Sequence, residues 1–267
     1  MAYILTKGIK MYYEVHGEGP PLLLIMGITA PGAVWEKHLN YWKSFFKCIV
    51  ADNRGVGNSD KPPGPYSTEQ MAEDYHGLLE ALQVSKVRVV GVSMGSTIAM
   101  QLCLRHPDEV SSMVLMCPWA RCDRMARSIF EHMIAIKGKL TPAEFARYIQ
   151  LLIFHKSSWD HDDVYQEMID GRLAAQEDES PQPFHALEAQ AIACMEHNVL
   201  SQLPNIFQPC LILGGKADIF TPEWMAREVA AAIPGSDLHL YDHSGHAFHW
   251  ENLDDFNRRV KDWLLHH

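Results

Sequence analysis

Two kinds of hydrophobic pattern alternate along the first half of the chain. Continuous apolar runs of four to six residues are typical of strands that are buried on both faces. Such runs occur at 22–26 and 48–51, and the predicted strands 87–92 and 112–117 are similar except for Arg88 and Ser112. Between them lie segments with apolar residues at helical spacing, of which 71–83 is the clearest because a capping-box sequence precedes it at 67–70. This alternation predicts a mostly parallel sheet with helices on both faces, an α/β fold class.

The pattern changes between residues 119 and 205. No strand-like run occurs there, and helical spacing predicts helices near 123–137, 141–152, 162–177 and 183–200. The earlier pattern then resumes with apolar strands at 210–214 and 237–241, a helix opened by Thr221-Pro222, and a final helix that we expect Asn252 to cap. We therefore predict an α/β core formed by 1–118 and 206–267, with an inserted helical cap at 119–205.

The first strand of the predicted core differs from the others. Residues 9–15 alternate apolar and polar side chains, which is typical of a half-exposed antiparallel strand. We therefore expect an antiparallel edge on an otherwise parallel sheet.

Composition narrows the function classes. The chain has 267 residues, 47% hydrophobic and 21% charged, with a formal net charge of −10. Nucleic acids and anionic membranes select basic surfaces, so neither is an expected partner, and a small-molecule substrate is. The first residues lack the long apolar core of a signal peptide, and no apolar run reaches transmembrane length, so we predict a cytoplasmic protein. The six cysteines show no Cys-x-x-Cys pairing, which favours buried free thiols over a metal site.

The most informative motif is Gly91-Val92-Ser93-Met94-Gly95. It joins a β-branched strand to an apolar helix without spare residues, so the chain must turn sharply at Ser93. A side chain at Gly91 or Gly95 would collide with the neighbouring strand or helix. Such a turn lifts the serine hydroxyl clear of the backbone, which is the arrangement of a nucleophile elbow.

A serine nucleophile needs a base and an orienting acid. Asp218 follows the strand 210–214, and His246 follows the strand 237–241. Because the carboxyl ends of parallel strands gather at one edge, both side chains should lie near Ser93. His243 and His249 are the alternative bases, and the Gly-His sequence at 245–246 favours His246.

The tetrahedral intermediate also needs preorganised N–H donors. Met94 supplies one backbone N–H because it directly follows the nucleophile. The loop after the strand 22–26 should supply the other, with Ile28 the first choice and Gly27 the second. Gly27 and Trp119, where the cap leaves the core, are the candidate substrate contacts.

These residues resemble the α/β-hydrolase superfamily, and within it the 3-oxoadipate enol-lactonase-like serine hydrolases. The resemblance rests on four segments: the elbow, the Asp-x-Arg-Gly-x-Gly-x-Ser turn at 52–59, the Asp-x-x-Thr-Pro sequence at 218–222 and Gly-His-Ala-Phe-x-Trp-Glu at 245–251. It implies a helical cap inserted after the sixth strand of that fold, and a structural role for the turn at 52–59. The chain departs from the family at Met26 and Val92, where a histidine is common, and both changes alter the pocket wall.

We hypothesise a cofactor-independent and metal-independent serine hydrolase that cleaves a small carboxylic ester or lactone through an acyl-enzyme. A carbon–carbon bond hydrolase of the dienone or β-diketone type could use the same triad, and a non-catalytic ligand-binding member of the fold is a third hypothesis. An enol-lactone substrate would require cationic groups for its carboxylate, and Arg121, Arg124 and Arg127 at the cap entrance are candidates. A homodimer is compatible with these features.

Overall fold

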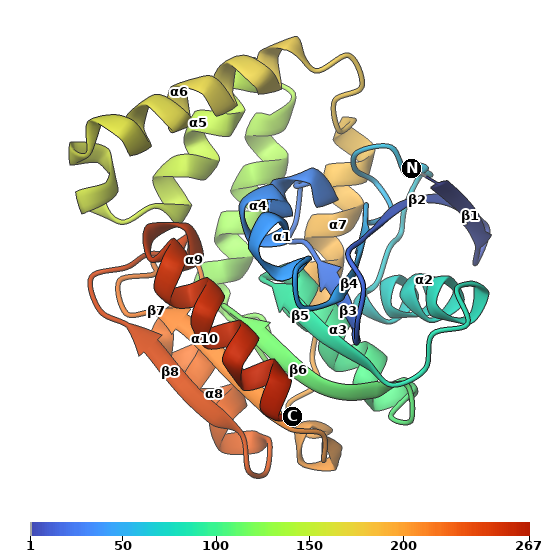
Figure 1. Cartoon of the computed structure of the whole chain (residues 1–267). Coiled ribbons are helices and arrows are strands. Elements are labelled where there is room, and N and C mark those ends of the chain that lie inside the picture. Colours follow the sequence, from blue (N-terminus) through green and yellow to red (C-terminus); the bar gives the residue numbers. More distant parts are fainter. Residues whose placement is uncertain (1) are drawn as a thin grey trace.

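The computed structural model describes residues 2–267, which form an eight-stranded sheet flanked by helices (Figure 1). The strand order is β1-β2-β4-β3-β5-β6-β7-β8. Strands β1 and β2 pair antiparallel at one edge, β2 runs antiparallel to β4, and all pairs from β4 to β8 are parallel. The strands are β1 (Ala2–Thr6), β2 (Ile9–His16), β3 (Pro21–Ile25), β4 (Lys47–Ala51), β5 (Val87–Val92), β6 (Val110–Met116), β7 (Cys210–Gly215) and β8 (Asp237–Tyr241). The predicted fold class is confirmed.

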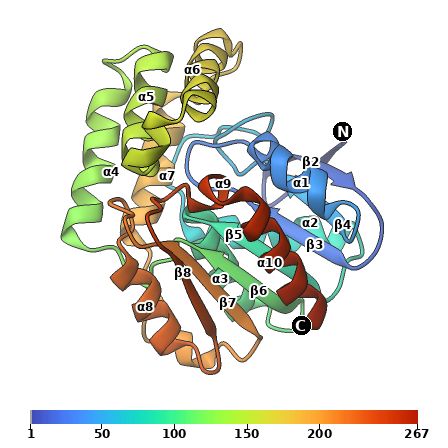
Figure 2. The same cartoon turned by 60° about the vertical axis from the view of Figure 1, so that its left-hand side comes forward.

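Each face of the sheet carries its own helices. Helices α1 (Glu36–Trp42) and α10 (Leu253–His266) cover one face, and α2 (Thr68–Ala81), α3 (Met94–Arg105) and α8 (Glu223–Ala232) cover the other (Figures 1 and 2). Successive residues of a buried strand point to opposite faces. In β3, Leu22 and Leu24 therefore pack in the cluster that contains Phe256 of α10, whereas Leu23 and Ile25 pack in the cluster that contains Tyr75 of α2.

Four helices form the segment between β6 and β7. They are α4 (Arg124–Lys137), α5 (Pro142–Ile153), α6 (Asp162–Glu177) and α7 (Phe184–Glu196), and they stand together beyond one end of the sheet (Figures 1 and 2). Helix α5 begins with a capping box between Thr141 and Glu144 and has Pro142 in its first turn. We refer to these four helices and their connections as the cap, and to α5 and α6 with the short helix between them as the cap hairpin.

One cap helix is shorter than predicted. We expected a helix over 183–200, but α7 ends at Glu196 and His197 is extended. The chain leaves the helix because Val199 N donates to Ala120 O at 2.8 Å and Asn198 forms a β-bridge with Arg121. The first and last segments of the cap thus lie side by side.

Two further differences concern the ends of the core. Strand β1 was not predicted: Ala2–Leu5 are apolar in sequence, but Leu5 is 81% exposed, and pairing with β2 rather than a fully buried face maintains the strand. Asn252 stands at the start of α10 but makes no side-chain cap. Its side-chain amide instead donates to Ser244 Oγ at 2.8 Å and Phe248 O at 2.9 Å, because the short helix α9 (Phe248–Glu251) immediately precedes it.

The remaining elements are three short 3₁₀ helices, at Gly32–Trp35, Lys156–Asp160 and Leu203–Asn205. All six cysteines are free thiols, and five of them are buried. No helix within residues 2–267 is long and apolar enough to cross a membrane.

Candidate active site

Ser93 lies at a strained turn between β5 and α3. Its backbone has φ 55° and ψ −121°, in the left-handed half of conformational space that non-glycine residues rarely adopt. A Cβ on Gly91 would lie 2.3 Å from Gly95 O, and a Cβ on Gly95 would lie 2.1 Å from Ile25 O. Only glycine permits these approaches, so the motif folds locally as the sequence predicted.

Asp218 and His246 meet at the same edge of the sheet. Asp218 Oδ2 lies 2.8 Å from His246 Nδ1 and accepts a hydrogen bond from Thr221 Oγ1, also at 2.8 Å. Asp218 Oδ1 accepts from the backbone N–H groups of Phe220 at 2.8 Å and Thr221 at 2.9 Å. Because the carboxylate accepts at Nδ1, that nitrogen carries the proton and Nε2 keeps its lone pair. The imidazole is therefore oriented for a general base.

Contacts through the end of β6 link Ser93 to the loop that carries His246. Ser93 N donates to Met116 O at 2.8 Å, at the end of β6. The next residue, Cys117, places its Sγ 3.4 Å from His246 O. Burial, and then the adjacent Asp218 carboxylate, raise the pKa of the Cys117 thiol well above its usual value, so the thiol is neutral. The exposed fractions of Ser93 and His246 are only 5% and 7%, which keeps both largely away from bulk water.

The alternative bases occupy other positions. His249 is buried, and its Nδ1 lies 2.9 Å from Nε2 of His38. Nδ1 of His38 in turn lies 2.7 Å from Asn257 Oδ1. Burial lowers the pKa of His38 to about 4 and that of His249 well below its usual value. His243 lies on the wall of a cavity described below. Of the three histidines, only His246 hydrogen bonds to Asp218.

The loop after β3 lies directly beside the nucleophile. A Cβ on Gly27 would be 3.3 Å from Ser93 Cβ. Within residues 2–267, the backbone N–H groups of Ile28 and Met94 donate to no other protein group, and that of Met94 belongs to the first turn of α3. Both remain available for an oxyanion. The side-chain amide of Asn53 holds the loop by donating to Met26 O at 2.8 Å.

Comparison with known proteins identifies the family of this chain. The family model described as the alpha/beta hydrolase fold matches residues 20–253, which is most of the chain. The protein belongs to the α/β-hydrolase fold family. A curated relative from Mycobacterium tuberculosis, named as the non-heme bromoperoxidase BpoC, is 31% identical over 254 residues, with 93% of this chain and 95% of that protein covered.

Solved structures of α/β hydrolases are also similar. A thermophilic esterase from Thermogutta terrifontis is 25% identical with a TM-score of 0.86, covering 98% of this chain and 97% of that chain. The enol-lactonase from Burkholderia xenovorans has a TM-score of 0.88 over 99% of this chain and 100% of that chain, and its 23% identity supports the fold alone. The resemblance expected from the sequence motifs is thus confirmed at the level of the family.

The other predicted substrate contacts, Trp119 and the arginines at the cap entrance, do not gather into one binding site. Trp119 is buried against Phe130 and His197, and its indole Nε1 has no hydrogen-bond partner among the described residues. Arg121 and Arg127 pair with surface carboxylates, Arg121 with Glu228 at 3.0 Å and Arg127 with Glu196 at 2.9 Å. Both side chains are at least 40% exposed, and Arg124, the first residue of α4, is exposed as well, so none of the three is positioned to bind a substrate carboxylate near Ser93.

A large cavity lies beside the candidate triad rather than on it. Its volume is about 1030 Å³, and it opens between the cap hairpin, the start of α1 and the segment 242–252. None of the three triad residues, nor Trp119 or Gly27, lines it. Thr29 and Ser244 do, and they are close neighbours in sequence of Ile28 and His246. The cavity therefore borders both loops that carry the proposed catalytic groups.

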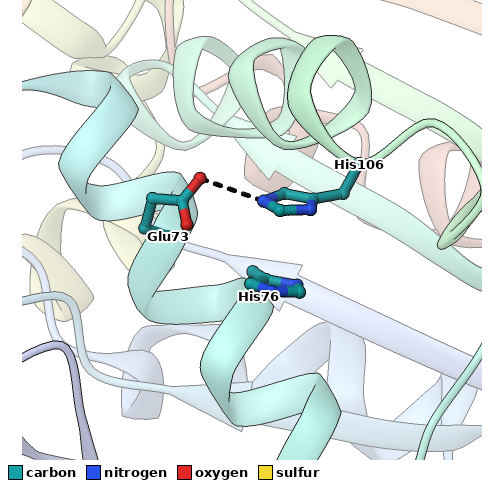
Figure 3. A group of neighbouring side chains, drawn as sticks. All are labelled: Glu73, His76 and His106. Atoms are coloured by element: carbon teal, nitrogen blue, oxygen red, sulfur yellow. Dashed lines mark hydrogen bonds and ion pairs between the residues drawn. The ribbon is translucent and has the colours of Figure 1, made fainter.

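Two groups of side chains have the composition of metal ligands. In Figure 3, Glu73 and His76 project from α2 toward His106, which follows α3. The two imidazole rings are stacked with centroids 3.7 Å apart and planes 8° apart, so their in-plane lone pairs cannot converge on one ion. Glu73 Oε1 already accepts hydrogen bonds from Arg105 at 2.7 Å and His106 at 2.9 Å. Although burial opposes it, these bonds lower the pKa of Glu73 to about 2.

The second group is Cys117 with Asp218 and His246. A metal would need a thiolate, and the buried Cys117 thiol is held neutral. Neither group therefore fits a metal ion, and we describe both as hydrogen-bonding clusters.

Sequence reasoning missed several residues that support the site. Gln190 of α7 accepts from Thr29 N at 3.1 Å through Oε1 and donates to Arg54 O at 2.8 Å through Nε2, so the cap contacts the loop that carries Ile28. Gln190 is fully buried. Thr29 and Arg54 are more than a hundred residues away from Gln190 in sequence, and no local pattern could have identified these two contacts.

Proposed function

We propose that this protein is a serine hydrolase that cleaves a small carboxylic ester or lactone through an acyl-enzyme on Ser93. The observation that carries the proposal is the hydrogen bond that His246 Nδ1 donates to Asp218, at the same sheet edge as the strained turn at Ser93. The family membership supports hydrolytic chemistry without specifying the substrate.

In the acylation step, His246 Nε2 accepts the Ser93 proton while Oγ attacks the substrate carbonyl carbon. The backbone N–H groups of Met94 and Ile28 stabilise the negative charge that develops on the carbonyl oxygen. The imidazolium then donates its proton to the leaving alcohol as the carbon–oxygen bond breaks. For a lactone, the leaving group stays attached to the acyl chain.

In deacylation a water molecule replaces the alcohol. His246 removes a proton from that water, which attacks the acyl carbon, and the proton returns to Ser93 Oγ as the acid is released. Two backbone N–H groups and the Thr221 hydroxyl donate to the Asp218 carboxylate and hold it against the imidazole, where it stabilises the imidazolium.

The charges around the site favour a neutral substrate. Arg121 and Arg127 pair with carboxylates at the surface, and Arg124 is exposed at the start of α4, so the three candidate arginines do not form a site for the carboxylate of an enol-lactone acid. We therefore assign an uncharged ester or lactone in preference to an anionic one.

The test is intact-mass measurement after treatment with a fluorophosphonate, with wild type and Ser93→Ala compared. One adduct on the wild type and none on the variant is the expected result. Product analysis with ester, lactone and dienone substrates then separates acyl-oxygen from carbon–carbon cleavage. A folded wild type that neither labels nor turns over any of the three classes, but binds a ligand, would refute the proposal in favour of a binding protein.

A further inference from the structure

Glu251 joins the cap to the loop that carries His246. It is the last residue of α9, and its carboxylate accepts three hydrogen bonds from two segments. Oε1 accepts from His155 N at 2.6 Å and Ser158 Oγ at 2.8 Å, both in the cap hairpin. Oε2 accepts from Gly245 N at 2.8 Å. One side chain therefore bridges the hairpin and the residue directly before His246.

The backbone reinforces the same connection on the other side of the histidine. Ala247 N donates to Ile153 O at 2.8 Å, at the end of α5. A Cβ on Gly245 would lie 2.5 Å from Ile153 O and 2.8 Å from His155 N, so only glycine permits this close approach. Both sequence neighbours of His246 thus contact the cap hairpin, and the imidazole lies between them in the chain.

We propose that Glu251 is a positioning residue, which holds the His246 loop against the cap hairpin so that the imidazole keeps its alignment between Asp218 and Ser93. This inference rests on the proposed function, because His246 is the general base of that mechanism. The His246 ring is held by the Asp218 and Thr221 contacts and lies beside the ring of Phe220, with centroids 5.2 Å apart. The position of its backbone is therefore important.

Only a carboxylate satisfies this arrangement. All three partners of Glu251 are donors, and they are divided between its two oxygens. Glutamine has the same length but replaces one oxygen with an NH₂ group. That group would face either Gly245 N–H or the two donors of the hairpin, so Glu251→Gln breaks one side of the bridge without removing side-chain volume.

A second tether provides a matched control. Lys37 of α1 and Glu167 of α6 form an ion pair at 2.6 Å, which also connects the cap hairpin to the core but does not contact the His246 loop. Its side chains are 47% and 61% exposed. If Glu251 acted only by anchoring the cap, Glu167→Gln would reproduce its effect; if it positions His246, the two variants will differ.

The experiment compares wild type, Glu251→Gln, Ser158→Ala and Glu167→Gln in two assays. The first is turnover of p-nitrophenyl acetate, with kcat and KM determined separately. The second is hydrogen–deuterium exchange of peptides covering 243–248 and 153–158, which requires no catalytic activity. Circular dichroism and thermal unfolding check that each variant is folded.

For Glu251→Gln we expect kcat to fall by about tenfold to a hundredfold with little change in KM, because small displacements of a catalytic group cost rates of this order. Exchange at 243–248 should accelerate in the same variant. Ser158→Ala removes one of the three bonds and should accelerate exchange there to a smaller extent. Glu167→Gln should leave both kcat and exchange at 243–248 unchanged.

Unchanged kcat and unchanged exchange at 243–248 in folded Glu251→Gln would overturn the inference, as would equal effects of Glu167→Gln. If Glu251→Gln does not fold, Ser158→Ala decides, and wild-type exchange at 243–248 in that variant refutes positioning. A wild type without esterase activity would count against the proposed function alone, since the exchange comparison still tests whether Glu251 holds the loop.

Discussion

The buried histidine pair His38–His249 predicts that acid destabilises the fold. His38 is completely buried, its Nδ1 contacts Asn257 Oδ1 at 2.7 Å, and its Nε2 contacts His249 Nδ1 at 2.9 Å. A consistent proton arrangement has Nδ1–H of His38 donating to the asparagine and Nδ1–H of His249 donating to His38. Protonation of His38 would place two N–H groups against each other in an apolar environment. Burial is the main reason why its pKa is lowered to about 4.

The magnitude follows from linkage. Folding lowers the pKa of His38 from its ordinary value of 6.5 to about 4. Between these values the unfolded chain binds more protons than the folded one, so stability decreases as pH falls through this window. This one side chain therefore lowers the free energy of unfolding by about 2 kcal/mol between about pH 7.5 and about pH 5.

The assay is urea unfolding of wild type and His38→Gln at both pH values. Glutamine does not titrate and can still donate to Asn257 and accept from His249. The variant should be less stable at neutral pH, but its loss of unfolding free energy on acidification should be smaller than that of wild type by about 2 kcal/mol. An equal loss in both proteins would refute the reasoning. His197 at the end of α7, whose pKa burial also lowers to about 4, offers an independent repetition.

Two further predictions concern the candidate site and the core. Asp218→Asn should lower kcat/KM for an ester by about a thousandfold to ten-thousandfold, because the imidazole loses its orienting acceptor. Thr221→Val should lower kcat/KM far less, because it removes only one donor to Asp218. Equal losses in the two variants, measured by steady-state kinetics, would contradict this assignment. Arg54, whose side chain is 4% exposed, donates two hydrogen bonds of 2.6 Å to the Asp74 carboxylate. Asp74→Ala leaves this buried guanidinium without a partner and should destabilise the fold by about 3–5 kcal/mol in urea unfolding. A change below about 1 kcal/mol would show that water or another group compensates the guanidinium charge.

Local sequence signals predicted the elements whose shape depends on their own residues. The elbow at Ser93 was predictable because two glycines at fixed offsets are required by the turn itself. The cap helix α5 was predictable because Thr141, Pro142 and Glu144 form its first turn. The order of Asp218 and His246 along the chain was sufficient to place them together, because parallel strands end at a common edge.

The errors arose where distant segments decide the local conformation. Helix α7 ends four residues early because its continuation pairs with Ala120 and Arg121, which lie more than seventy residues earlier. The roles of Gln190 and Glu251 depend on partners that the sequence does not place near them. Strand β1 was missed because its apolar residues do not alternate with polar ones as its half-exposed burial would suggest, and its pairing with β2 cannot be read from local sequence.

The pairing of the two ends of the cap has an evolutionary consequence. Because Val199 N donates to Ala120 O, the chain leaves the core and returns to it at points one hydrogen bond apart. Closing the core across that gap needs only a short turn, so helices can be added, removed or exchanged there without changing the register of any strand. The sheet and the residues at its edge can therefore be retained while the cap diverges, and new substrate preferences can arise by replacement of one contiguous segment.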